Sequence, residues 1–183
     1  MLWRRLDIPG LEHFRLTMDG DRPRLAGTVL VAHDGQPLRL DYEIGCSPAW
    51  ETRTVVATLL LRDVTWRLDL VVDEQHRWFA DGREIPTLAG CVDVDLSLSP
   101  STNTLPIRRL GMLRLKADEA RDVVAGWVRI PELRVERLPQ RYTCLPEGYF
   151  RYESRGGQFV AELEVDDLGL VESYPPFWER VTD

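Results

Sequence analysis

The chain has 183 residues, which is long enough for a substantial hydrophobic core, and we expect a single domain over residues 1–183. Its hydrophobic share of 44% and charged share of 29% are typical of a globular protein. The net charge of -7 argues against a nucleic-acid-binding protein that relies on a general excess of positive charge.

The sequence supports neither a metal site nor a bound cofactor. The three cysteines, Cys46, Cys91 and Cys144, are scattered without a CxxC pair, so we expect reduced thiols. The histidines lack metal-ligand spacing, and no GxSxG, P-loop or GxGxxG motif supports hydrolase, nucleotide or dinucleotide chemistry. No segment resembles a signal peptide or approaches the roughly twenty apolar residues of a membrane span, which predicts a cytoplasmic protein.

Short segments of alternating apolar and polar residues dominate the first half of the chain. Glu12–Thr17 and Leu25–Ala32 flank the turn cluster Met18–Pro23 and predict a first hairpin. Leu38–Gly45 alternates most regularly, so one face of this strand is expected to be buried and the other solvated. Trp50–Arg62 is apolar on both faces in its second half, which is typical of a covered central strand.

The second half continues this pattern. Asp81-Gly82 predicts a type I′ hairpin turn, because both residue types tolerate positive φ. Ala117–Asp122 is the one candidate for a short helix, and Pro131 and Pro139 are expected to end strands. We expect the aromatic tail Tyr174–Trp178 to cap one end of the core. Further strands are expected at Val64–Val72, Leu110–Leu115, Val123–Arg129, Leu133–Leu138, Tyr149–Ser154 and Gln158–Val165.

About ten to fourteen short strands with almost no helix predict an all-β protein with minor α content. The choices are a sandwich, a barrel or a rolled open sheet. A sheet this large has to curl or close, because twist accumulates from strand to strand. A curled sheet that its side chains do not fill contains an apolar cavity with polar groups at its mouth.

One stretch combines a polar strand face with a loop and basic residues. Val92–Ser99 alternates strictly between valine or leucine on one face and aspartate or serine on the other, which is the period of a half-buried strand. Pro100 is expected to end this strand, because proline cannot donate a backbone hydrogen bond. Ser101–Asn103 should form a shaped loop before Pro106 reopens an extended segment that carries two arginines.

Asp93 and Asp95 lie two residues apart on one strand, so their carboxylates emerge on the same face within about 7 Å of each other. Two carboxylates at this distance can act as acid and base in glycoside hydrolysis. They can equally be structural partners of Arg53, Arg108 or Arg109. We favour a structural or ligand-anchoring role, because no third group at a fixed spacing supports an active site.

The loop and the arginines leave two further choices open. Asn103 can orient a sugar hydroxyl through its amide or close a turn through its own backbone, and we favour the turn. Arg108 and Arg109 point to opposite faces of an extended segment. At most one of them can therefore face Asp93 and Asp95, where it would form an ion pair or bind an anion.

Cys91–Arg109 resembles the characteristic segment of a family of bacterial proteins described as glycolipid-binding and formerly grouped as a domain of unknown function. Nearly the whole chain takes part in the resemblance. The other matching pieces are Tyr42-x-Ile44-x-Cys46 followed by Trp50-x-x-Arg53, Trp78-x-x-Asp81-Gly82, Arg141-Tyr142, Asp166-x-x-Gly169-x-Val171 and Tyr174-Pro175. The resemblance implies a large curled, mostly antiparallel sheet that forms a spiral β-roll or half-barrel around an apolar interior, similar in shape to lipoproteins that carry acyl chains.

The leading hypothesis is a non-catalytic binding or carrier protein for a lipid or glycolipid, whose acyl part is covered by apolar strand faces. The candidate ligand-binding residues are Arg53, Asp93, Asp95, Asn103, Arg108, Arg109, Trp50 and Tyr142. The alternative is an enzyme that acts on a sugar-containing or lipid substrate through the paired carboxylates. A third possibility is a fully plugged barrel that acts only through protein contacts.

Overall fold

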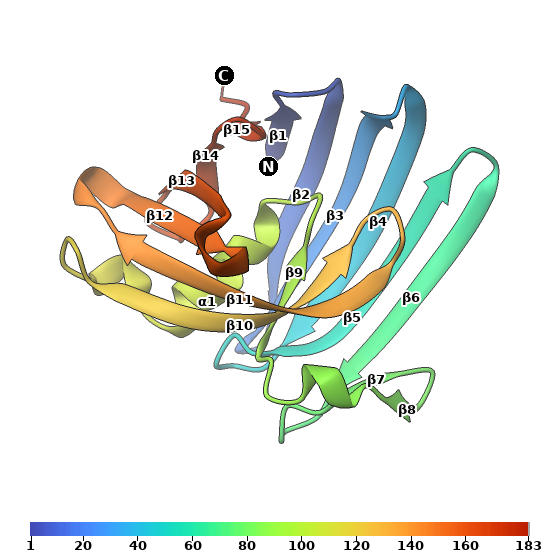
Figure 1. The fold of residues 1–183 in the computed structure, drawn as a ribbon, viewed down its shortest axis with the longest axis horizontal. Coiled ribbons are helices and arrows are strands. Elements are labelled where there is room, and N and C mark those ends of the chain that lie inside the picture. The colour runs from blue at the N-terminus through green and yellow to red at the C-terminus, as the bar shows by residue number, and fades with distance from the viewer. Residues whose placement is uncertain (183) are drawn as a thin grey trace.

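The computed structural model describes residues 1–182 and confirms an all-β chain with one short helix. Fifteen strands form one sheet, and short 3-10 turns connect some of them (Figure 1). The strands are β1 (Leu2–Arg5), β2 (Gly10–Asp19), β3 (Arg22–His33), β4 (Gln36–Cys46), β5 (Thr52–Leu61), β6 (Val64–Val72), β7 (Trp78–Ala80), β8 (Arg83–Glu84), β9 (Asp93–Leu96), β10 (Ala120–Arg129), β11 (Arg134–Cys144), β12 (Tyr149–Ser154), β13 (Phe159–Val165), β14 (Val171–Tyr174) and β15 (Trp178–Arg180). The helix α1 spans Thr104–Arg109, and the 3-10 turns are η1 (Pro86–Leu88), η2 (Ser101–Asn103), η3 (Met112–Arg114), η4 (Pro146–Gly148) and η5 (Arg155–Gly157).

The strand order is β8-β7-β6-β5-β4-β3-β2-β1-β15-β14-β13-β12-β11-β10-β9. Neighbouring strands are antiparallel except β9 and β10, which are parallel. The sheet is open, with β8 and β9 at its two edges, so a closed barrel is excluded and the spiral roll or half-barrel implied by the resemblance is not confirmed. The first and last strands lie in the middle of the sheet, because β1 pairs with β15.

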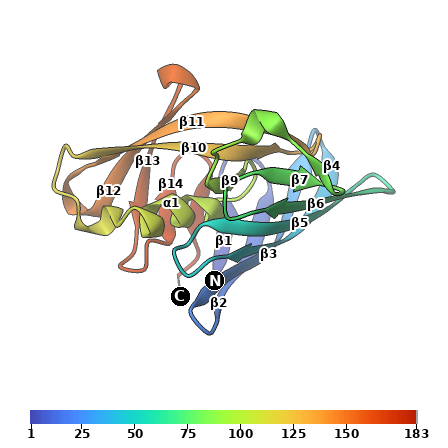
Figure 2. The ribbon, with the colours of Figure 1, turned by 90° about the horizontal axis from the view of Figure 1, so that it is seen from below.

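The edge strand β9 lies between the two halves of the sheet (Figure 2). It pairs with β10 on one side, and on the other the backbone N–H of Thr52 donates to the Val92 carbonyl at 3.2 Å. Trp78 of β7 packs on Gly126 of β10, and its indole N–H donates to the Cys91 carbonyl at 2.8 Å. The two halves are therefore joined through a shared core around β9.

The strand predicted at Val92–Ser99 is present as the shorter β9, but it is not half-buried as predicted, because Asp93 on its polar face is 1% exposed. Val94 and Leu96 are buried on the same side as Gly126 of β10. Asp93 and Asp95 pair with Ala125 and Trp127 of β10 and face the opposite side. Both carboxylates therefore leave β9 on the same face, where Asp93 meets Arg109 of α1 and Asp95 meets Gln140 of β11.

The segment after β9 differs from the prediction. Residues 99–107 are all buried, and Thr104–Arg109 is helical rather than extended. Pro106 lies in the first turn of α1, where a missing N–H breaks no helical hydrogen bond. The tertiary environment decides this conformation, because the segment fills the space between the two halves of the sheet.

Three further local predictions are wrong. Leu110–Leu115 contains the 3-10 turn η3 instead of a strand, because Gly111 has a left-handed φ of 59°. The helix predicted for Ala117–Asp122 is absent from the described structure, since β10 begins at Ala120. Pro139 lies inside β11, where β12 is paired only from Gln140 onward, so the proline sits at a locally free edge.

The ring of Tyr42 lies so close to Gly27 that a larger residue does not fit at this position. Replacing Gly27 by alanine is therefore expected to lower the free energy of unfolding by about 1–3 kcal/mol. The added Cβ would lie 2.6 Å from ring atoms of Tyr42, which hydrogen bonds hold in place. Gly45→Ala is the matched control, because its Cβ would meet only the exposed Thr54 side chain, which can rotate. Equal losses for the two variants in denaturant titrations would contradict this interpretation.

Candidate functional site

A cavity of about 180 Å³ lies between β9–β10 and the strands β11–β15. Its presence argues against a fully plugged interior. Aromatic rings and a few polar side chains form its wall. The lining residues are Arg5, Asp95, Leu96, Ser97, Ser99, Asn103, Trp127, Leu138, Tyr152, Ser154, Arg155, Phe159, Tyr174, Phe177 and Trp178.

Asp95 is the carboxylate of the cavity wall. The side-chain amide of Gln140 donates a hydrogen bond to it, and Asp95 stays half-buried because it faces the cavity. Burial raises the pKa of Asp95 to about 6, and the hydrogen bonds from Gln140 and Tyr152 oppose the shift. At neutral pH the cavity therefore contains a mostly ionised carboxylate.

Asp93 is held by Arg109 and does not line the cavity. The guanidinium donates two hydrogen bonds, Nε to Oδ1 at 3.0 Å and Nη2 to Oδ2 at 2.6 Å. The Asp93 side chain is 1% exposed and that of Arg109 17%. Burial raises the pKa of Asp93, and the ion pair with Arg109 opposes this shift. Of the two arginines considered in the sequence, Arg109 therefore forms the predicted ion pair, and its partner is Asp93.

Asn103 serves both of the roles considered for it in the sequence. Its amide N–H donates to the Pro100 carbonyl at 3.1 Å and so closes the turn, while the residue also lines the cavity. The Tyr142 hydroxyl donates to the Asn103 Oδ1 atom at 2.9 Å. Tyr142 itself is 1% exposed and lies behind the cavity wall. The tyrosine therefore fixes the orientation of the amide.

The remaining sequence candidates lie outside the cavity. Arg53 forms an ion pair with Glu51, which His76 also contacts. The Arg108 guanidinium lies 4.9 Å from the ring centroid of Trp50 in a cation–π contact. Of the eight candidate ligand-binding residues, the structure places only Asp95 and Asn103 on the cavity wall, and their binding role stays a prediction.

The sequence interpretation missed most of the aromatic wall. Tyr152, Phe159, Phe177 and Tyr174 come from β12–β14 and the turn before β15. Alternation in the hairpin Tyr149–Ser154 could have indicated that Tyr152 points inward. The aromatic tail Tyr174–Trp178 was expected to cap the core. Of its aromatic residues, only Trp178 is buried in the core, whereas Tyr174 and Phe177 face the cavity.

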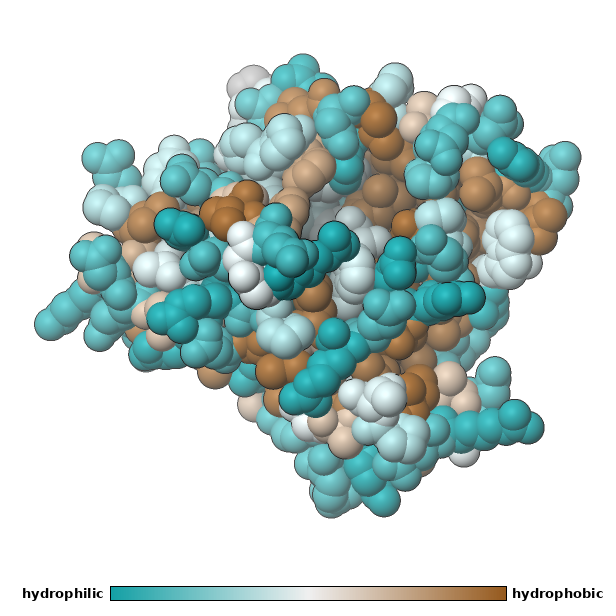
Figure 3. All heavy atoms as spheres, viewed as in Figure 1, coloured by the Kyte–Doolittle hydropathy of each residue, from teal (hydrophilic) through white to brown (hydrophobic). Residues whose placement is uncertain are grey.

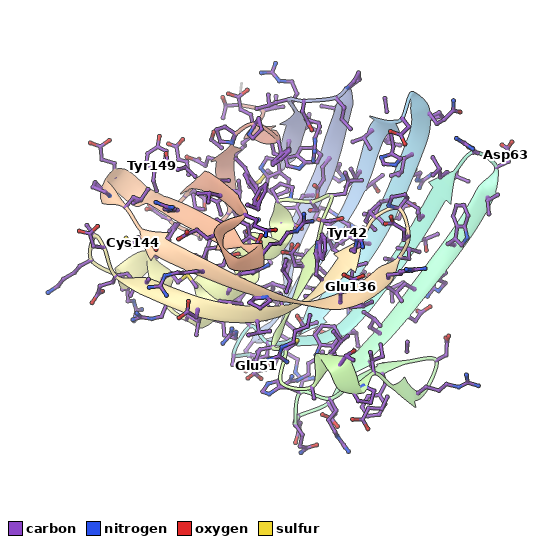
Figure 4. The ribbon with its side chains drawn as sticks, in the orientation of Figure 1. Tyr42, Glu51, Asp63, Glu136, Cys144 and Tyr149 are labelled. Atoms are coloured by element: carbon purple, nitrogen blue, oxygen red, sulfur yellow. The ribbon has the colours of Figure 1, made fainter. Side chains whose placement is uncertain are left out.

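A buried polar network behind Ser99 was also missed. The Glu12 side chain is 0% exposed, and its Oε1 atom accepts from the hydroxyls of Tyr42 at 2.5 Å and Ser99 at 2.7 Å. The Ser101 hydroxyl lies 2.7 Å from that of Tyr42, which Figure 4 labels in the interior. Burial raises the pKa of Glu12 to about 8, so this carboxyl is protonated at neutral pH. The network anchors the buried segment to β2 and β4.

Two other features of the surface lie apart from this cavity. A second cavity of about 390 Å³ lies at the far end of α1 beside η3, with Met112, Leu115, Phe150 and Val165 in its wall. On the face shown in Figure 3, hydrophobic side chains gather over the hairpin of β5 and β6, where Trp66 is 44% exposed.

The described residues contain no group of three or more metal-ligating side chains. No helix within residues 1–182 has the length and apolarity of a membrane-crossing segment.

Comparison with known proteins confirms the resemblance inferred from the sequence. Residues 1–180 match the family described as "Putative glycolipid-binding". A crystal structure of a DUF1089 family protein from Pseudomonas aeruginosa is 31% identical, and the match covers 93% of this chain and 92% of that chain with a TM-score of 0.79. A search of curated proteins finds no match.

Proposed function

Because the chain belongs to the "Putative glycolipid-binding" family, we propose that its cavity binds the sugar head group of a glycolipid without converting it. The observation that carries this proposal is the combination of ring faces with a carboxylate and an amide on one wall, at Trp127, Tyr152, Asp95 and Asn103. Aromatic faces pack on the apolar side of a sugar ring, while Asp and Asn side chains accept and donate hydrogen bonds to its hydroxyls.

The cavity size favours the head group over the acyl chain. An apolar cavity of roughly 150 Å³ holds one benzene molecule. At about 180 Å³, this cavity has room for one ring-sized group but not for a long acyl chain. We therefore assign the acyl part to the outside of the cavity, which revises the expectation that the interior encloses it.

Binding without catalysis follows from the separation of the two carboxylates. Glycoside hydrolysis needs an acid and a second carboxylate on the same substrate. Asp95 lines the cavity, whereas Asp93 is fully engaged by Arg109 and lies outside it. This arrangement leaves Asp95 as an anchoring group.

Replacing Trp127 by alanine is expected to weaken the binding of octyl glucoside by about two- to tenfold, which corresponds to the roughly 0.5–1.5 kcal/mol of an aromatic contact. The measurement is a titration below the micelle-forming concentration. Trp66→Ala is the control, because Trp66 is exposed on β6 and lies outside the cavity. The proposal is overturned if the wild-type protein binds neither octyl glucoside nor any lipid of a bacterial extract in native mass spectrometry.

A further inference from the structure

Asp95 is a carboxylate without a cationic partner. No arginine, lysine or histidine within residues 1–182 lies within 4 Å of its oxygens, in contrast to Asp93. Its polar neighbours are the Gln140 amide and the Tyr152 hydroxyl, both neutral groups. A ligand that fills the cavity would remove the remaining water from this carboxylate. Burying an ionised carboxylate without a counter-charge is costly, so the site favours a ligand that supplies one.

Four aromatic rings of the cavity wall form a closed cycle beside this carboxylate. The ring centroids of Tyr152 and Phe159 are 5.9 Å apart, those of Phe159 and Phe177 5.9 Å, those of Phe177 and Tyr174 5.7 Å, and those of Tyr174 and Tyr152 6.4 Å. The negative charge of Asp95 acts on both Tyr152 and Tyr174. Ring faces attract a cation within roughly 6 Å of their centroids. Rings and carboxylate therefore favour the same kind of ligand group.

Two arginines of the wall do not neutralise Asp95. Arg5 is paired with Asp7 and stacks over Phe177 and Trp178 at 4.9 and 5.0 Å. Arg155 is exposed and stacks over Trp127 at 5.0 Å. Each guanidinium is thus held at another part of the wall, where it can donate to ligand hydroxyls, and the negative charge of Asp95 remains unmatched.

We propose that the cavity selects an amino sugar, whose ammonium group lies against Asp95 and the rings of Tyr152 and Tyr174, since the Phe177 ring already carries Arg5 and stacks on Phe159. The inference rests on the proposed function and names the class of its head group. The contact between an ammonium group and a carboxylate is a charge-assisted hydrogen bond, which is roughly twice as strong as a neutral one.

The test compares octyl glucosaminide with octyl glucoside, which differ only in an amine in place of one ring hydroxyl. At pH 7 and 150 mM salt, we expect the wild-type protein to bind the amino sugar about tenfold more tightly. Asp95→Asn keeps the shape of the side chain and removes its charge, so this variant should bind both probes alike. Asp122→Asn removes one negative charge from the exposed part of β10 and should keep the preference of the wild-type protein.

The outcomes separate the two proposals. Equal affinities for both probes in the wild-type protein would overturn the amino-sugar assignment and leave glycolipid binding intact. A preference that survives in Asp95→Asn would also overturn it, because the selectivity would then come from the net negative charge of the protein. If neither probe binds, both proposals are wrong.

Discussion

Replacing Arg109 by methionine is expected to lower the free energy of unfolding by about 3–5 kcal/mol, since it leaves a buried charge without a partner. Asp93 is 1% exposed, and the two hydrogen bonds from Arg109 are its only ion-pair contacts within the described residues. Methionine preserves much of the apolar stem of arginine. The loss therefore reports the unpaired carboxylate rather than missing volume, and urea titration at pH 7 measures it.

A matched control uses an exposed ion pair of the same type. Arg141 pairs with Asp122 at 2.8 Å, but their side chains are 52% and 75% exposed. Arg141→Met should therefore change the stability by at most about 1 kcal/mol. Adding Asp93→Ala to Arg109→Met should recover part of the loss, because no buried charge then remains. A double variant that loses the sum of both single effects would contradict this explanation.

Replacing Glu12 by glutamine is expected to make the protein less sensitive to rising pH. The pKa of Glu12 is about 8 in the folded chain and about 4.5 in the unfolded chain. Between these values the unfolded chain releases a proton that the folded chain keeps, so rising pH favours unfolding by up to about 1.4 kcal/mol per pH unit. Glutamine has no proton to release. From pH 5 to pH 8, the variant should therefore gain on the order of 3 kcal/mol relative to the wild-type protein.

Tyr42→Phe separates the titration of Glu12 from the hydrogen bonds around it. This variant loses the hydrogen bond to the carboxyl but keeps the carboxyl buried. It should be less stable at every pH and retain a pH dependence like that of the wild-type protein. Parallel pH profiles for Glu12→Gln and the wild-type protein would show that Glu12 does not titrate in this range.

The sequence predicts those parts of the fold that local signals determine. Leu38–Gly45 alternates and lies within β4, and Asp81-Gly82 forms the predicted turn with φ values of 48° and 73°. The conformation of Thr104–Arg109 is not predicted, because its leucine, isoleucine and proline are compatible with an extended segment. It becomes helical where it fills the interior between the two halves of the sheet, and this environment has no signature within the segment itself.

The candidate site shows the same division between local and long-range determinants. Asp95 is predictable from the alternation of a single strand, and so is its position on the same face as Asp93. The ring cycle cannot be predicted from local sequence, since Tyr152, Phe159 and Tyr174 come from three strands and meet only after the sheet has formed. The role of Asp93 depends on α1 as well, because the helix brings Arg109 to it.

The pairing of β1 with β15 delays the completion of the sheet until the end of protein synthesis. Each strand from β2 to β8 pairs with the strand that precedes it in the sequence, so this half of the sheet can assemble as the chain leaves the ribosome. Trp3 instead meets Arg180, which is synthesised 177 residues later. Until then β1 presents an unpaired edge, which is a template for pairing with another chain. The period of greatest risk of aggregation therefore lasts until the final strand has emerged.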